Sequence, residues 1–287
     1  MTPPEPPDSP RAARPHSPLA PSDPLIDDLG TPYLRFERRG PLGWVIVDRP
    51  GARNALTPAM YLGVRLAVDL VERDPELHGL VITGTGDVFI PGGDMSGHHD
   101  DATHDAIEYL GIDMLPFQSL RRSRVPVVAS VNGLCQGGGL IIALCADVTV
   151  ASDRATFRAP ETLRGVVDVN LAAMLPAHVG VAMARDLLMT GRRVTASEAV
   201  QLGIVARMCA HDDLEAATLQ AAKDLLMAAP DTRAQVKELM NRRYGPIDEI
   251  TFARSLASPE VVEGFAAFTE KREPSWVPEA FREGKRL

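Results

Sequence analysis

The sequence has few cysteines and lacks a long apolar run. Its three cysteines, Cys135, Cys145 and Cys209, are odd in number and have no paired C-x-x-C spacing. We therefore expect a reducing compartment, with no disulfide framework or thiolate metal site and with the thiols as small buried apolar groups. No apolar run approaches the roughly 20 residues of a membrane-spanning helix. The N-terminus also lacks the layout of a signal peptide, so we expect a cytoplasmic protein.

Excess positive charge is also absent. The formal net charge is −8 at pH 7, whereas a nucleic-acid-binding protein needs a clustered positive field. No nucleic-acid partner is expected, and an anionic ligand needs a local basic pocket. Hydrophobic residues make up 45% of the chain and charged residues 24%, which is typical of a globular protein. A length of 287 residues is enough for one continuous core.

The chain divides into three predicted segments. Residues 1–30 are rich in Pro, Ser and Asp and cannot bury enough apolar surface to fold, so they form a disordered tail. This tail is either passive or a proline-rich ligand for a partner. Residues 31–225 are predicted to form the core. Residues 226–287 form a helical segment that packs on this core or on a neighbouring subunit.

Short apolar strands alternate with helical stretches in the core. Between the first two strands, Thr57 and Pro58 form a helix start, and the helix runs through Glu72. Its buried face is predicted to hold Leu62, Leu66, Val68 and Leu70. This alternation predicts an α/β fold with covered sheets. The predicted strands are residues 44–47, 80–83, 127–131 and 148–150.

Helix caps also mark the last third of the chain. Residues 195–198 (TASE) have the form of a capping box, and Gly203 ends that short helix. Ser258 and the following proline start a late helix that carries Val262, Phe265 and Phe268.

Two glycine clusters follow apolar strands, where α/β proteins expose backbone to ligands. The first is in residues 88–95 (VFIPGGDM) and the second in residues 132–139 (NGLCQGGG), which lead directly into an apolar helix. Glycines at a helix start leave free amides that suit an anionic oxygen. If the Gly93 amide faces the Gly138 amide, the two donors can stabilise an enolate, each contributing about 3 kcal/mol. Otherwise the clusters are tight turns that allow close packing.

Both clusters belong to a set of motifs that resembles the crotonase superfamily, which includes enoyl-CoA hydratases and isomerases. The resemblance covers residues 33–272. It implies a spiral of ββα units, an acyl-CoA thioester as substrate, and assembly as a homotrimer or a dimer of trimers. The motifs are residues 49–56, 89–94, 131–147, 157–165, 188–191 and 263–271.

The resemblance also implies catalytic residues. Gly93 and Gly138 correspond to the paired oxyanion-hole amides, and Glu161 to a glutamate that moves a proton at the acyl chain. Hydratases carry a second glutamate two residues after the glycine triplet, where this sequence has Ile141. Because isoleucine cannot transfer a proton, we expect isomerisation or another single-carboxylate reaction rather than hydration. Asp168 is a second candidate acid.

Two other functions remain open at this stage. The loss of the second glutamate fits a catalytically silent acyl-CoA-binding protein. A lyase or thioester hydrolase that uses Asp168 is also possible.

For the CoA end of the ligand, the resemblance implies contacts from Ala52 and Arg53, with Arg53 as the cation for the phosphates. Phe268 and Lys271 correspond to a helical pair that contacts CoA, often from the adjacent subunit. Gly92 and Asp94 complete the predicted binding set. No permanently bound cofactor is expected, because CoA arrives as part of the substrate.

One histidine-rich stretch invites a metal interpretation. It comprises residues 98–101 (HHDD) and His104. Its spacing is not that of a closed zinc site and no cysteine is near, so we expect a polar loop over the acyl pocket and no bound metal.

Overall fold

From β3 to β8, consecutive strands of the chain alternate between two sheets in the computed structural model, which describes residues 28–94, 115–278 and 282. The larger sheet has the order β1-β2-β3-β5-β7-β10, and its strands are parallel except for β1, which pairs antiparallel with β2. Its strands are β1 (Leu34–Arg39), β2 (Leu42–Val47), β3 (Gly79–Gly84), β5 (Val127–Val131), β7 (Val148–Ser152) and β10 (Arg207–Cys209).

The smaller sheet takes the strands in between. Its order is β4-β6-β8-β9, with the β8 and β9 pair antiparallel. After the β1 and β2 hairpin and its helix, the chain therefore advances as three strand pairs, β3 with β4, β5 with β6 and β7 with β8, each with one strand in each sheet and each followed by a helix. This spiral confirms the predicted α/β fold class. The strands are β4 (Val88–Ile90), β6 (Leu134–Gln136), β8 (Thr156–Arg158) and β9 (Val194–Thr195).

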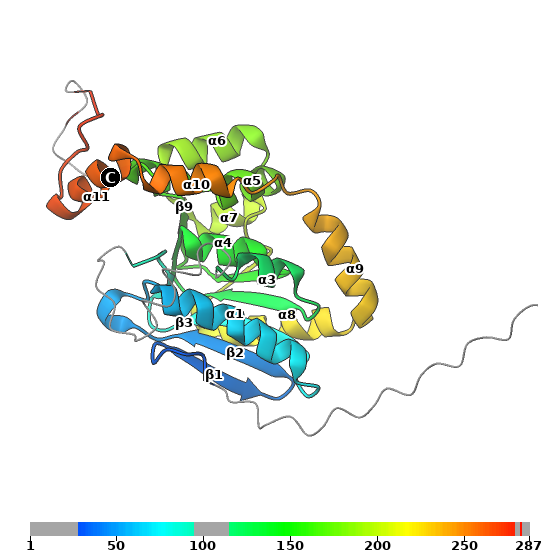
Figure 1. The fold of residues 1–287 in the computed structure, drawn as a ribbon. Coiled ribbons are helices and arrows are strands. Elements are labelled where there is room, and N and C mark those ends of the chain that lie inside the picture. The colour runs from blue at the N-terminus through cyan, green and yellow to red at the C-terminus, as the bar shows by residue number, and fades with distance from the viewer. Residues whose placement is uncertain (1–27, 95–114, 279–281, 283–287) are drawn as a thin grey trace, which may run out of the picture.

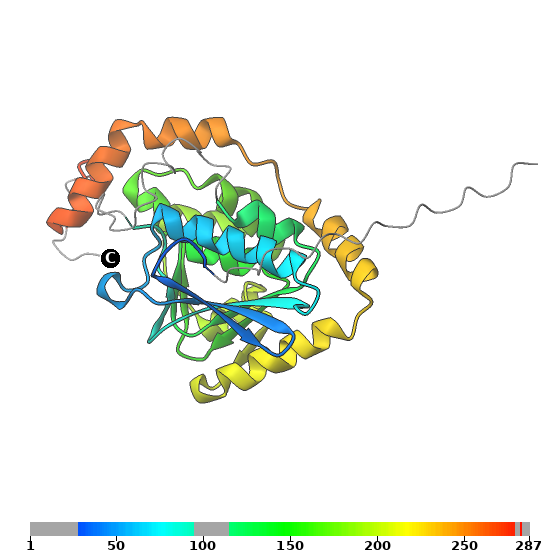
Figure 2. The same ribbon diagram turned by 60° about the horizontal axis from the view of Figure 1, so that its bottom comes forward.

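Helices cover both faces of the larger sheet, as Figure 2 shows for α1 (Pro58–Arg73) and α8 (Leu214–Leu226). Alternate strand residues point to opposite faces. Leu80 and Ile82 therefore lie in the same cluster as the buried side chains of α1, and Val81 lies with those of α8. Burial on both faces explains why these strands read as continuous apolar runs.

The predicted start of α1 is confirmed, but its predicted buried face is partly wrong. The Thr57 side chain accepts a hydrogen bond of 3.2 Å from the amide of Met60. The buried face holds Met60, Val64, Ala67, Val68, Leu70 and Val71. Leu62 is half-buried and Leu66 is 37% exposed. A helix advances 100° per residue, which places these two leucines beside the buried stripe.

The last third of the chain is helical, as predicted. The Thr195 side chain caps α7 (Ala196–Leu202), Gly203 ends it in the left-handed conformation, and Ser258 caps α11 (Pro259–Glu270). From α8, the helix α9 (Pro230–Asn241) crosses the side of the molecule to α10 (Glu249–Leu256) (Figure 1).

The helix α11 buries small residues and leaves two of its larger apolar side chains exposed. Val261, Gly264 and Ala267 are buried, whereas Val262 is 72% and Phe268 50% exposed. Small residues on the buried face let the helix backbone approach its neighbour closely.

Several predictions concern residues near or beyond the ends of the described segments. The tail prediction falls mostly on residues 1–27, which lie outside the described residues. Leu29, near its end, is 2% exposed and joins the core beside α1. Cys135 and Cys145 are free and buried, as expected, and Cys209 is partly exposed. Among the described residues, no helix has the length and apolar character to cross a bilayer.

Candidate active site

The loop after β4 pairs with the backbone of Leu56 and points the amide of Gly93 away from it. The carbonyl of Gly92 accepts a hydrogen bond of 3.0 Å from Leu56, and the amide of Asp94 donates one of 2.8 Å back to Leu56. In a trans peptide the carbonyl and the following amide point in opposite directions. The Gly93 N–H therefore points away from Leu56, and no acceptor for it is found among the described residues.

The second glycine cluster brings another amide to the same place. Helix α4 (Gly138–Cys145) begins at Gly138, and the amides of its first turn have no acceptor within the helix. A Cβ built on Gly92 would lie 3.9 Å from the Gly138 nitrogen. Loops that are distant in sequence thus place Gly92, the residue before Gly93, next to Gly138, at the positive end of a helix.

A buried ion pair holds the first loop in place. Arg49 Nη1 lies 2.7 Å from Asp94 Oδ2, and both side chains are 9% exposed. The side-chain oxygen of Asn54 accepts a hydrogen bond from the Arg49 amide, and its nitrogen donates one of 2.8 Å to the carbonyl of Val88. Asp94 therefore anchors the loop, and its predicted contact with a ligand stays a prediction.

The carboxyl group of Glu161 lies against the second glycine cluster. Glu161 starts the short 3-10 helix η3 (Glu161–Arg164). A Cβ built on Gly137 would lie only 2.2 Å from Glu161 Oε1, and Gly137 has a φ of +51°. Only glycine fits both requirements. Glu161 Oε2 is buried and has no hydrogen-bond partner among the described residues.

Asp168 makes a second buried carboxyl group next to Glu161. It caps α5 (Val169–Val179), with Oδ1 accepting a hydrogen bond of 2.8 Å from the Leu171 amide. Burial, and then repulsion by Asp168, raises the pKa of Glu161, while burial raises the pKa of Asp168. Two carboxyl groups in one poorly solvated site resist ionising together, so the pair retains a proton at a higher pH than isolated carboxyls.

The sequence did not identify Tyr61, which lies in the same site. A Cβ built on Gly138 would lie 2.1 Å from the Tyr61 hydroxyl oxygen, and one built on Gly93 would lie 3.6 Å from it. Burial, followed by the charges of Glu161 and Asp168, raises the pKa of this phenol. In sequence Tyr61 looks like any aromatic residue in the first turn of an amphipathic helix, so nothing marked it as part of a site.

The position where hydratases carry their second glutamate is apolar. Ile141 lies in the first turn of α4 and is 3% exposed, and this turn contains no acidic residue. Among the described residues, the titratable side chains near the glycine amides include Glu161 and Tyr61, with Asp168 close enough to raise the pKa of both.

The predicted CoA-binding residues lie on two separate elements. Ala52 ends the 3-10 helix η1 (Pro50–Ala52), and Arg53 follows in the left-handed conformation with an exposed side chain. On α11, the ring of Phe268 lies 4.4 Å from the Arg164 guanidinium, and Lys271 is exposed. Their contacts with CoA stay predictions.

Helix α11 packs directly on the segment that carries Glu161. A Cβ on Gly264 would lie 2.4 Å from the backbone of Arg164, and one on Gly165 would lie 2.5 Å from the backbone of Glu260. These close backbone contacts hold η3, and with it Glu161, in place against α11.

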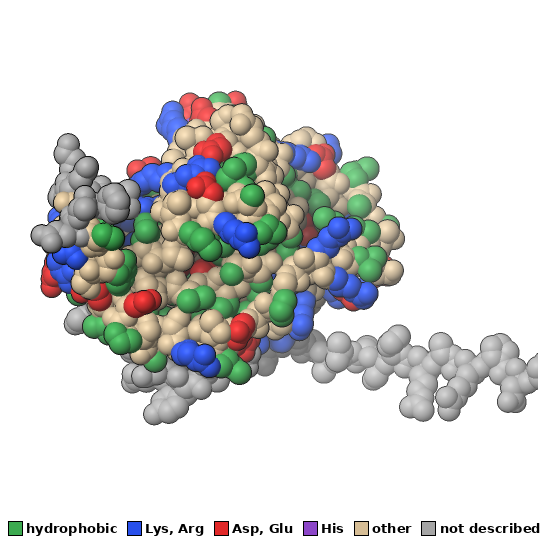
Figure 3. Space-filling model, turned by 90° about the horizontal axis from the view of Figure 1, so that it is seen from above, with side chains coloured by type: hydrophobic (Ala, Val, Ile, Leu, Met, Phe, Trp, Pro, Cys, Tyr) green, Lys and Arg blue, Asp and Glu red, His purple; other side chains and the backbone are tan. Residues whose placement is uncertain are grey.

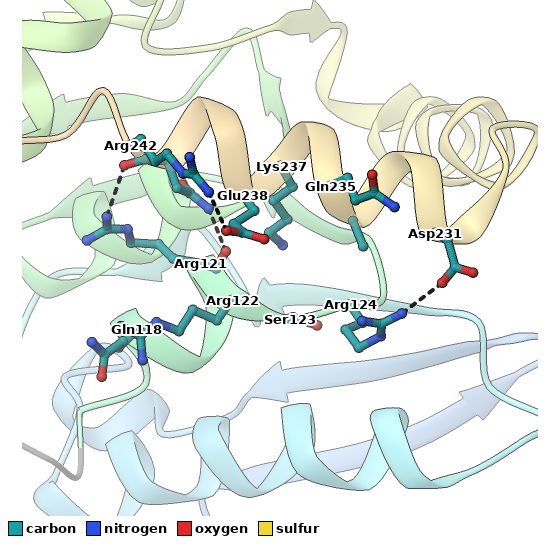
Figure 4. A pocket seen from close by; sticks show the side chains of 12 residues that line it. Gln118, Arg121, Arg122, Ser123, Arg124, Asp231, Gln235, Lys237, Glu238 and Arg242 are labelled. Atoms are coloured by element: carbon teal, nitrogen blue, oxygen red, sulfur yellow. Dashed lines mark hydrogen bonds and ion pairs between the residues drawn. The ribbon is translucent and has the colours of Figure 1, made fainter.

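A separate hollow of 620 Å³ lies between α3 (Phe117–Arg122) and α9 (Figure 4). Arg124 lies 2.8 Å from Asp231, and Arg242 lies 2.9 Å from Glu238. Because its charges are largely paired, and because it shares no lining residue with the glycine loops, we do not assign the chemistry to it. The predicted loop at residues 98–104 lies outside the described residues.

Comparison with known proteins identifies related sequences and structures. The profile of the enoyl-CoA hydratase/isomerase family matches residues 38–279. A carnitinyl-CoA dehydratase from Salmonella arizonae is 33% identical over 256 residues, covering 85% of this chain and 97% of that protein. A probable enoyl-CoA hydratase from Mycobacterium bovis is 31% identical over 252 residues, with coverage of 85% and 97%.

Solved structures agree with the sequence comparisons. The crystal structure of an enoyl-CoA hydratase from Mycobacterium avium subsp. paratuberculosis has a TM-score of 0.75 and 28% identity. The match covers 86% of this chain and 99% of that one.

Proposed function

The chain belongs to the enoyl-CoA hydratase/isomerase family, and from that premise we propose that it moves a proton on an acyl-CoA thioester. The observation that carries this proposal is the buried Glu161 carboxyl, which has an oxygen without a hydrogen-bond partner among the described residues. This carboxyl lies beside Gly137, the residue before Gly138, whose amide has no acceptor among the residues that the structure describes. An unpaired buried carboxyl is costly and is expected where a ligand completes its interactions.

The two glycine amides have the role of an oxyanion hole in this proposal. Removing a proton from the carbon next to a thioester carbonyl places negative charge on the carbonyl oxygen. Donors fixed at that oxygen stabilise the enolate without reorganising, and each contributes about 3 kcal/mol. The N–H groups of Gly93 and Gly138, for which no acceptor is found in the described part of the chain, support this role.

Glu161 carries the proton. As the carboxylate, it takes a proton from a carbon of the enoyl chain, and the electron pair of the broken C–H bond delocalises into the thioester as a dienolate. The carboxylic acid then returns the proton to a different carbon, so the double bond moves and no atom is gained or lost. Burial and Asp168 raise the pKa of Glu161, which makes its carboxylate a stronger base.

Isomerisation, or another reaction that needs one carboxylate, is favoured over hydration because Ile141 is apolar and buried. A specific observation supports hydration or dehydration as the second candidate. Asp168 is close enough to Glu161 to raise its pKa, so it can supply a second carboxyl from a different element. The names of the dehydratase and hydratase relatives agree with this candidate.

Binding of CoA and assembly into trimers complete the proposal. Arg53 provides an exposed cation for the CoA phosphates. Apolar side chains remain exposed on α9 to α11, and Figure 3 shows hydrophobic side chains between charged ones on the face that carries α10. Surfaces of this kind support association into a homotrimer or a dimer of trimers. They include Leu239, Met240, Ile250 and Val262, at 58%, 67%, 73% and 72% exposure.

A panel of enoyl-CoA isomers, followed by mass and absorbance, tests the function. Isomerisation changes the absorbance of the conjugated thioester at constant mass, whereas hydration adds one water. Release of free CoA would indicate a hydrolase. If no substrate changes and the α-protons of a saturated acyl-CoA do not exchange with deuterated water, the protein is a silent acyl-CoA-binding protein. Light scattering gives the number of subunits, and a monomer would contradict the trimer.

A further inference from the structure

One polar group in the candidate active site has no assigned role. The hydroxyl of Tyr61 lies against the two glycines whose amides form the proposed oxyanion hole. The hydroxyl could not lie there if residue 138 had a side chain, because a Cβ would approach it to 2.1 Å. The glycine at 138 thus makes room for the phenol as well as for the ligand.

No hydrogen bond of the Tyr61 hydroxyl is found within the part of the chain that the structure describes, and Tyr61 is only half-buried, so its hydroxyl is open to a ligand. The hydroxyl of Tyr244, by contrast, lies 2.9 Å from Nε2 of His178. A hydroxyl that faces a binding site and has no partner in the protein is available to donate a hydrogen bond to the ligand.

The ring of Tyr61 is well placed to hold its hydroxyl in one position. It meets the ring of Phe117 edge-on, with centroids 6.0 Å apart and an interplanar angle of 83°. Burial and the two neighbouring carboxyls raise its pKa, so the phenol keeps its proton and remains a donor across the physiological range.

We propose that the Tyr61 hydroxyl is a third hydrogen-bond donor of the thioester site and binds the same carbonyl oxygen as the Gly93 and Gly138 amides. This inference rests on the proposed function. It adds a side-chain donor from α1 to two main-chain donors, at the point where negative charge develops in the enolate. A third donor also helps to explain how the site could operate with Ile141 in place of a second glutamate.

The test compares Tyr61→Phe with Tyr244→Phe. The first removes the hydroxyl and keeps the ring against Phe117; the second removes a partnered hydroxyl outside the site. For Tyr61→Phe we expect kcat to fall about 10- to 100-fold, with KM within about 3-fold of wild type, because the bond strengthens as the oxyanion forms. Tyr244→Phe should keep the wild-type kcat.

Infrared spectroscopy of a bound acyl-CoA labelled at the thioester carbonyl gives an independent measurement. In the wild type the carbonyl band should lie below that of free acyl-CoA, and in Tyr61→Phe it should move part of the way back. An unchanged band, or an unchanged kcat, in Tyr61→Phe would overturn the proposal, even if the pH profile changed.

The same data separate this inference from the proposed function. If the wild type polarises the carbonyl and Glu161→Gln abolishes turnover, but Tyr61→Phe behaves as wild type, then only the role of Tyr61 is wrong. If the wild type neither turns over nor polarises any acyl-CoA, the proposed function itself is wrong.

Discussion

Replacement of Glu161 by glutamine is the sharpest single perturbation of the proposed mechanism. Glutamine has the same size, so it can keep the close contact with Gly137, but it cannot accept a proton from carbon. A positioned acid or base contributes about 10²- to 10⁴-fold to a rate. We therefore expect kcat to fall at least about 100-fold, while acyl-CoA binding changes less than about 3-fold.

The same substitution should have a different effect on stability: it lowers activity but does not lower the free energy of unfolding. The folded protein holds the proton of Glu161 more tightly than the unfolded chain, whose carboxyl has the ordinary pKa of 4.5. The ionised carboxylate therefore destabilises the fold as pH rises above that value. Glu161→Gln removes this cost, so the free energy of unfolding should stay the same or rise by about 1 kcal/mol at neutral pH. The gain should be smaller at low pH.

Turnover on the active enoyl-CoA and thermal unfolding at two pH values measure both effects. Glu249→Gln, at an exposed position on α10, is the matched control and should change neither. Wild-type turnover by Glu161→Gln would refute its role as the proton carrier. A large loss of stability would instead show that the carboxylate supports the fold.

Three further predictions concern other parts of the site. Gly138→Ala should lower kcat/KM about 100-fold, because the new Cβ would lie 2.1 Å from the Tyr61 hydroxyl oxygen. Adding Tyr61→Phe should restore part of the loss, because the nearest remaining ring atom, Cζ, lies 3.1 Å from that Cβ. Arg53→Ala should raise KM about 5- to 10-fold without changing kcat, and less so at high salt, whereas Arg122→Ala should not. For isomerisation, kcat/KM should rise with pH to a midpoint above 4.5, as the raised pKa of Glu161 requires, and a fall over that range would indicate that Glu161 acts as an acid.

Local chemistry explains which parts of the fold could be predicted. The starts of α1, α7 and α11 follow from Thr57, Thr195 and Ser258, because a capping side chain bonds to an amide only a few residues away. Four strands of the larger sheet, β2, β3, β5 and β7, were also recognisable, because burial on both faces leaves a run of apolar residues. The short strands of the smaller sheet were not predicted.

Contacts between distant segments explain what could not be predicted. The exposure of Leu66 depends on which face of α1 meets the sheet. The fit of Glu161 against Gly137 depends on η3 packing against α11 and α6 (Val181–Thr190). Tyr61 gave no local signal at all, because its place in the site, and with it its proposed role, follows from two glycines that lie 32 and 77 residues further along the chain.

The electrostatic influence of Asp168 on Glu161 could not be predicted from the sequence either. Sequence placed Glu161 and Asp168 in one region through the family resemblance, but it did not indicate that they influence each other. The chain turns at Gly165, whose φ is +72°, between η3 and α5. This turn brings the second carboxyl back toward the first, which is how a chain with Ile141 still has two acidic groups in the site.

A crystal structure with a non-reactive acyl-CoA analogue would test the central claim most directly. We predict that the thioester oxygen lies about 3 Å from both the Gly93 and the Gly138 nitrogen, with Glu161 next to the acyl carbons. A carbonyl oxygen that meets only one of the two amides, or an analogue bound in the hollow between α3 and α9, would contradict the account.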